Sequence, residues 1–197
     1  DSEPFTVAAS AALAGEFPDE IAAHCQQAGV AAVELDALRR RPLGMLSREA
    51  VVDAIGRLRG LGVQVAALRS PSVSNRALDL ISLAAEQGVK RVVMPLSHEA
   101  GHFAAAARDA QIAISFFNHD LDSDACSRIL LALHGQGLRA FFTFNGPNFA
   151  RCGELPFLAS YKKKLRRFVD QLDVADGTYD GRPQPLACGN GEIKEMI

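Results

Sequence analysis

Polar side chains that could bind a small molecule follow several apolar runs of this sequence. The segment 114–120, ISFFNHD, is mostly apolar over four residues and then presents an amide, an imidazole and a carboxylate. Comparable side chains follow the other runs, and the candidates are Glu34, Arg69, Asn118, His119, Asn145, Asn148, Asp173 and Asp176. Any one of them could be an ordinary turn residue. Gly, Ser or Pro would be enough to form a turn after each strand. Because amide, imidazole and charged side chains recur there instead, the pattern predicts a polar ligand.

Three of these residues could carry out acid–base chemistry. Glu34 or Asp173 could remove a proton next to a carbonyl group, with His119 as the partner acid. Glu34 has a second interpretation, which the sequence leaves open: a strand-end carboxylate that is salt-bridged to Arg69 on the neighbouring strand. The residues predicted to bind substrate are Arg69, Asn118, Asn145, Asn148 and Asp176.

These residues must be positioned by a repeating βα pattern. Apolar runs rich in Val, Ile, Phe and Ala predict seven strands, at 5–9, 32–35, 63–68, 91–95, 112–117, 139–144 and 169–174. Amphipathic stretches predict helices after 18, after 47 and at 76–87, 99–109, 124–134 and 155–168. Strands that are apolar on both faces and separated by helices should be parallel.

The number of βα units favours a barrel over an open sheet. Seven nearly equal units exceed the usual open doubly wound sheet and approach the eight of a (β/α) TIM-type barrel. The sequence therefore predicts one α/β barrel domain over 1–197, with the active site at the carboxyl ends of its strands. An eighth strand is missing, because the end, GNGEIKEMI, is typical of a helix beginning. The barrel is incomplete, truncated or completed by another chain.

Composition excludes several classes of function. Apolar residues make up 48% and charged residues 22%, as in ordinary globular proteins. The net charge of −2 provides no general attraction for nucleic acid or anionic lipid. Four scattered cysteines indicate neither a zinc knuckle nor a disulfide scaffold. We expect a cytoplasmic protein that binds a small molecule and no nucleic acid or membrane, and that forms a homodimer or covers its open edge with segment 177–185.

Several short motifs resemble the xylose isomerase-like barrels, which include sugar phosphate isomerases and epimerases and relatives of endonuclease IV. The resemblance runs from about residue 5 to the end of the chain. The motifs are VELD at 33–36, SFFNHD at 115–120, TFNGPN at 143–148, QLDVADG at 171–177 and GNGEIKEMI at 189–197. It implies a TIM barrel that acts on a sugar or sugar phosphate.

The resemblance also implies a divalent metal held by Glu, Asp, His and a final Glu, but most of these ligands are replaced here. Phe117 stands for the first Glu, Asn145 for the Asp and Asp173 for the His, and the final Glu falls on the missing strand. Phe has no donor atom, and a neutral amide is a weak ligand for a hard cation. No metal ligand set can be assigned. A relocated site for Mn²⁺, Zn²⁺ or Mg²⁺ at Glu34, His119 and Asp173 is chemically conceivable.

Two hypotheses of function follow. One is an isomerase or epimerase acting on a small sugar or sugar phosphate, and the other is a non-catalytic binding or interaction protein on the same barrel. Two other motifs have plain structural interpretations beside functional ones. SYKKKLRRF at 160–168 is interpreted as a solvated helix face rather than a phosphate-binding stripe. CGNGE at 188–192 is interpreted as a loop that could bring backbone N–H groups to a phosphate.

Overall fold

The computed structural model describes residues 5–73 and 75–196. Contacts within the chain divide it into two compact units. The first unit comprises Asp1–Met94 with Asp109–Ile112, and the second comprises Pro95–Arg108 with Ala113–Ile197.

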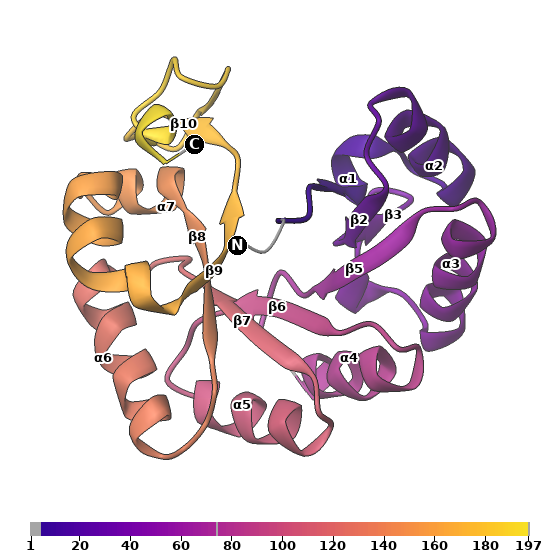
Figure 1. Ribbon diagram of the computed structural model, residues 1–197, viewed down its shortest axis with the longest axis horizontal. Coiled ribbons are helices and arrows are strands. Elements are labelled where there is room, and N and C mark those ends of the chain that lie inside the picture. The colour runs from indigo at the N-terminus through magenta and orange to yellow at the C-terminus, as the bar shows by residue number, and fades with distance from the viewer. Residues whose placement is uncertain (1–4, 74, 197) are drawn as a thin grey trace. The chain divides into compact units, whose positions relative to one another are not determined.

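In the first unit, helices alternate with parallel strands (Figure 1). Its strands lie in chain order as β1 (Ala8–Ser10), β2 (Ala32–Leu35), β5 (Gln64–Arg69) and β6 (Arg91–Pro95), the last of which ends at the boundary between the units. Its helices are α1 (Ala11–Ala14), α2 (Pro18–Gln27), α3 (Arg48–Gly60) and α4 (Asn75–Glu86). A short antiparallel pair, β3 (Ala37–Leu38) and β4 (Arg41–Pro42), follows β2, with a 3₁₀ turn at Leu43–Met45.

Local signals explain where the helices of this unit begin and end. Ser47 precedes α3, and its hydroxyl accepts a hydrogen bond from the backbone N–H of Ala50 at 3.3 Å. Gly62, with φ of +81°, follows the helix in the left-handed region, where glycine is favoured. The apolar faces of α2 and α3 bury Ile21, Ile55 and Leu58 completely.

The second unit repeats the pattern of alternating strands and helices. Its parallel strands are β7 (Ala113–Phe117), β8 (Phe141–Asn145) and β9 (Val169–Asp173). Its helices are α5 (Ala100–Asp109), α6 (Ser123–Gly135) and α7 (Gly146–Arg151). A π-helix, η2 (Pro156–Leu165), runs into a 3₁₀ turn, η3 (Arg166–Phe168). The C-terminal segment contains the antiparallel pair β10 (Asp176–Gly177) and β11 (Pro183–Gln184) and a 3₁₀ turn, η4 (Ile193–Glu195).

Aromatic side chains fill the core of the second unit. Phe116, Phe142, Phe144 and Phe149 are completely buried. The rings of Phe144 and Phe149 stack with their centroids 5.0 Å apart. Because Phe149 lies on α7 and Phe144 on β8, this contact holds the short helix against the strand that it follows. The residues at the carboxyl end of β8 are positioned by the same contact.

The fold prediction is confirmed. The described residues supply seven parallel strands that alternate with helices, one fewer than a complete (β/α) barrel. Several details differ from the expectation. The first strand spans Ala8–Ser10 rather than 5–9, and the structure adds the two short antiparallel pairs β3–β4 and β10–β11. The stretch 155–168 is π-helical and then 3₁₀ rather than one α-helix, and the C-terminal stretch forms only the turn Ile193–Glu195.

None of the helices in the described part of the chain is both long enough and apolar enough to cross a membrane.

Candidate functional site

The carboxyl ends of β7, β8 and β9 bring four predicted residues together. Asn145 is the last residue of β8, and its amide donates a hydrogen bond to Oδ2 of Asp173, the last residue of β9, at 3.2 Å. The side chain of Asn148 donates to the backbone carbonyl of Asn118 at 2.7 Å. Asn145 also caps α7, because its Oδ1 accepts from the backbone N–H of Asn148 at 3.1 Å. We call these four residues the asparagine site.

The side chain of Asn118 is the unusual member of the asparagine site. Asn118 is completely buried. Neither its Nδ2 nor its Oδ1 has a hydrogen-bond partner among the described residues. A buried amide without a partner costs about 1–3 kcal/mol, so native proteins nearly always satisfy such groups. Because Nδ2 and Oδ1 are closed to solvent, a ligand or a water could reach this amide only after neighbouring side chains move.

His119 lies beside the asparagine site on an exposed loop. Its side chain is 60% exposed, and its Nε2 lies 3.8 Å from the carboxylate of Asp120. Asp120 also faces Arg151 at 3.9 Å. A hollow of about 400 Å³ is lined by His119, Asp120, Asp122, Arg151 and Cys152.

The sequence interpretation missed Arg151 and Cys152. The signal for Arg151 was present, because it follows Asn148 by three residues on α7 and that spacing places two side chains on one helical face. Burial raises the pKa of the Cys152 thiol, and the nearby carboxylate of Glu154 raises it further. The raised pKa disfavours the thiolate form that a nucleophilic cysteine requires.

Asp176 is buried, and the C-terminal loop satisfies its carboxylate. Backbone N–H groups of Gly177, Gly189 and Gly191 each donate to it at 2.9 Å. Burial alone would raise the pKa of Asp176. The backbone donors, which include Ala187, outweigh burial and hold the pKa below its ordinary value. The N–H groups of two glycines in the CGNGE loop thus bind an internal carboxylate, which gives both the loop and Asp176 a structural role here.

Glu34 and Arg69 lie in the first unit and form an ion pair. Arg69 Nε lies 2.5 Å from Glu34 Oε1, and the two side chains are only 17% and 11% exposed. The pairing between β2 and β5 shifts register between Val33 and Glu34, which aligns Glu34 with Ala67, two residues before Arg69. The interpretation of Glu34 as salt-bridged to Arg69 is confirmed. A catalytic role for Glu34 stays a prediction.

The described residues do not fit the metal site that the resemblance implies. Within 5–73 and 75–196, no group of three or more His, Cys, Asp and Glu side chains could hold a metal ion. Phe117 is buried and has no donor atom. Asn145 is occupied by its bonds to Asp173 and to the start of α7. We therefore derive no chemistry through a metal.

Divalent metal ions should not stabilise the protein. A ligand stabilises a protein only when it binds the folded state more tightly than the unfolded state. Because the described residues provide no metal site, millimolar Mn²⁺, Zn²⁺ or Mg²⁺ should shift Tm by less than about 1 °C. Thermal unfolding after EDTA treatment, with each ion added back, measures this shift. A larger shift that Asp173→Asn abolishes would establish a metal site after all.

The strands, helices and polar strand ends define a (β/α) TIM-type fold, and solved structures share it. A xylose isomerase-like TIM barrel protein from Mycobacterium smegmatis, in complex with magnesium, superposes with a TM-score of 0.71 at 14% identity, over 98% of this chain and 85% of that chain. A xylose isomerase domain protein from Planctomyces limnophilus gives 0.66 at 12% identity, over 86% and 75%. The probable 3-DHS dehydratase AsbF from Bacillus anthracis, involved in petrobactin synthesis, gives 0.62 at 12% identity, over 89% and 75%.

This protein therefore has the fold of the xylose isomerase-like TIM barrels, as the sequence motifs predict. The identities are low enough that these similarities show the fold alone. No protein-family model matches the sequence, and none of the curated proteins matches it significantly.

Proposed function

We propose that the asparagine site binds a small polyhydroxylated, sugar-like molecule without help from a divalent metal. The buried amide of Asn118, which has no partner among the described residues, is the observation that carries this proposal. A ligand hydroxyl both donates and accepts, so it complements an amide that offers Nδ2 and Oδ1. Asp173, whose carboxylate is oriented by Asn145, can accept from a second hydroxyl.

The choice of a sugar-like ligand rests on the kinds of groups present. Three amides and one carboxylate provide both donors and acceptors with a single negative charge, whereas a purely apolar molecule would leave them unpaired. The fold likeness supports the same class, since its members include proteins that are named for xylose isomerase. The neighbouring hollow, with Arg151 and His119, can accommodate a longer substrate.

The variant Asn118→Leu tests the proposal. It is close in shape and removes both unsatisfied atoms, so the free energy of unfolding should stay equal or rise. Binding of sugars and sugar acids, followed by ligand-observed NMR and calorimetry across a panel, should weaken by at least about tenfold through loss of a hydroxyl's hydrogen bonds. Gln136→Leu, which changes an exposed amide in the same unit, is the matched control.

A different result would assign Asn118 to the scaffold. If Asn118→Leu destabilises the protein and leaves ligand binding unchanged, the amide holds a structural water and the proposal fails.

Isomerase or epimerase chemistry is the second candidate. It is favoured by the carboxylate of Asp173, which Asn145 holds at the strand end, and by His119 in the adjoining loop. Asp173 would remove a proton next to a substrate carbonyl and His119 would donate one. Exchange of a substrate C–H for deuterium in D₂O, in the presence of EDTA and abolished by Asp173→Asn, would establish it. Binding without any exchange would restrict the protein to the first candidate.

A further inference from the structure

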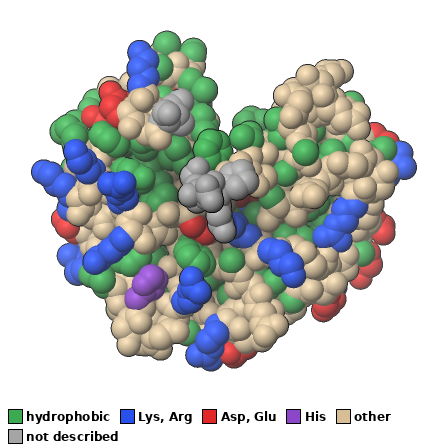
Figure 2. All heavy atoms as spheres, in the orientation of Figure 1, with side chains coloured by type: hydrophobic (Ala, Val, Ile, Leu, Met, Phe, Trp, Pro, Cys, Tyr) green, Lys and Arg blue, Asp and Glu red, His purple; other side chains and the backbone are tan. Residues whose placement is uncertain are grey.

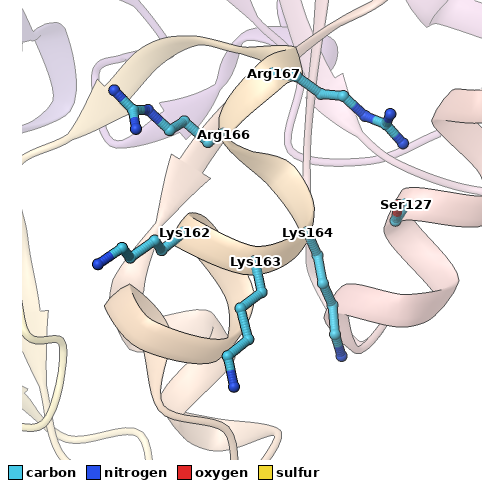
Figure 3. Close-up of a pocket in the computed structure, with 6 residues that line it drawn as sticks. All are labelled: Ser127, Lys162, Lys163, Lys164, Arg166 and Arg167. Carbon is cyan, nitrogen blue, oxygen red and sulfur yellow. The ribbon is translucent and has the colours of Figure 1, made fainter.

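A strongly basic hollow lies on the second unit, and the residues that line it are different from those of the asparagine site. It has a volume of about 570 Å³ and is lined by Ser127, Lys162, Lys163, Lys164, Arg166 and Arg167 (Figure 3). We call it the basic hollow. In Figure 2, Lys and Arg side chains gather on the left side of the view, where Figure 1 draws the orange helical segment above α6.

The helix geometry explains how consecutive charges come to line one hollow. On a regular α-helix the run KKKLRR would spread its charges around the axis. Here the chain is π-helical through Leu165 and 3₁₀ from Arg166, so the number of residues per turn changes within the run. Lys163 and Lys164 extend in nearly the same direction, and Arg167 extends toward α6, which carries Ser127, whereas Lys162 and Arg166 extend to the opposite side (Figure 3).

The charge of the basic hollow is only slightly compensated. Lys164 pairs with Asp124 of α6 at 2.8 Å, and this hydrogen bond raises the pKa of Lys164. Within the described residues, none of the other four cations forms an ion pair with an acidic side chain. The whole chain has a net charge of −2, so this surface is opposite in sign to the average of the molecule. Such a local field attracts anions.

We propose that the basic hollow binds a compact polyanion, a small molecule that bears several linked phosphate groups. Arg167, on the side of Ser127, and Arg166, on the opposite side, can each donate two parallel hydrogen bonds to phosphate oxygens, and Lys162 and Lys163 add point charges. The hydroxyl of Ser127 adds one more donor. The volume lies within the range for small-molecule sites.

The lining residues decide against larger polyanions. Among the described residues, no aromatic side chain lines the hollow, so successive bases of a nucleic acid would have nothing to stack on. None of the apolar side chains in the same part of the chain lines it either, so a lipid surface would lack the insertion that accompanies basic membrane-binding helices. The lining therefore offers a ligand only positive charge and hydrogen-bond donors, which are the groups that a chain of phosphates requires. The segment 160–168, which the sequence predicts to be a solvated helix face, is therefore proposed to bind linked phosphate groups.

Titration of the full chain with inorganic tripolyphosphate tests this proposal. The triple variant Lys163→Ala, Arg166→Ala, Arg167→Ala should raise Kd by at least about tenfold, since each charge-assisted hydrogen bond contributes more than a neutral one. Lys164 is left unchanged, because its pair with Asp124 joins η2 to α6. Raising the salt concentration should weaken binding, and inorganic phosphate should bind less tightly than tripolyphosphate.

The matched control removes two exposed lysines elsewhere. The double variant Lys90→Ala, Lys194→Ala lowers the net charge without touching the hollow and should change Kd by less than about twofold. Arg166→Lys with Arg167→Lys keeps the charge and should weaken binding by losing bidentate contacts. Equal weakening in the control variant, or no measurable binding of tripolyphosphate at low salt by the folded wild-type chain, would overturn the proposal.

Discussion

Replacing Asp176 with asparagine should lower the free energy of unfolding by about 2–4 kcal/mol at pH 7, because three backbone N–H groups donate to its buried carboxylate. Asparagine keeps one acceptor oxygen but places an NH₂ group where the second oxygen accepts from Gly189. Two donors would then face each other in a buried position. Chemical denaturation followed by circular dichroism measures the change.

The effect of Asp176→Asn should depend on pH in a defined direction. The folded pKa of Asp176 lies below its ordinary value of 3.8. Its contribution to stability is therefore complete above the unfolded pKa and is lost as the pH falls through the folded pKa. The difference in stability between wild type and variant should stay constant from pH 7 to about 5 and shrink below about 4. A difference that grows on acidification would contradict this account.

Two further variants separate the buried carboxylate from general effects on the C-terminal segment. A Cβ on Gly189 would lie 2.4 Å from Asp176 Oδ1 and 2.6 Å from the carbonyl oxygen of Gly177, so Gly189→Ala should destabilise the same segment. Gly135→Ala, at a helical position with open space around it, should be neutral or stabilising. Asp180→Asn, on the same segment but exposed, should change stability little.

The strands were predictable because their signal is local. The runs at 32–35 and 91–95 coincide with β2 and β6, because short segments that contain Val and other apolar residues, between flanks that favour turns, are typical of buried strands, even though Glu34 interrupts the first run. The helix at 155–168 was not predictable in its actual form. Residues there have ordinary helix propensities, and the change from π to 3₁₀ geometry at Leu165 arises where η2 packs on α6 and α7.

The candidate site was predictable to the extent that parallel strands align their carboxyl ends. That rule correctly brings Asn145 next to Asp173, and it brings Asn148 to Asn118. It could not show that the backbone N–H groups of Gly189 and Gly191 donate to the carboxylate of Asp176. The loop between these residues spans thirteen to fifteen positions, and its closure leaves no periodic signal in the sequence. The same limit concealed the missing partner of the Asn118 amide, which depends on burial rather than on residue type.

The ion pair between Glu34 and Arg69 gives the second large prediction. Glu34→Ala should lower the free energy of unfolding by about 2–4 kcal/mol, because it removes a carboxylate from a largely buried guanidinium. Arg69→Ala should have a comparable effect. The double variant should lose less than the sum of the two single variants, with a coupling of at least about 1 kcal/mol, since residues in direct contact are not independent. Urea denaturation of the four proteins of this cycle measures the coupling.

An exposed pair supplies the control and shows what the cycle decides. Asp19→Ala breaks a pair with Arg57 in which both side chains are more than half exposed, so it should change stability little. If Glu34→Ala behaves like Asp19→Ala, the buried pair contributes little to stability, and the prediction that Glu34 acts as a base becomes the better account of its position. If the coupling is large, Glu34 is committed to Arg69 as a structural partner, and Asp173 and His119 remain as the candidates for the proposed acid–base chemistry.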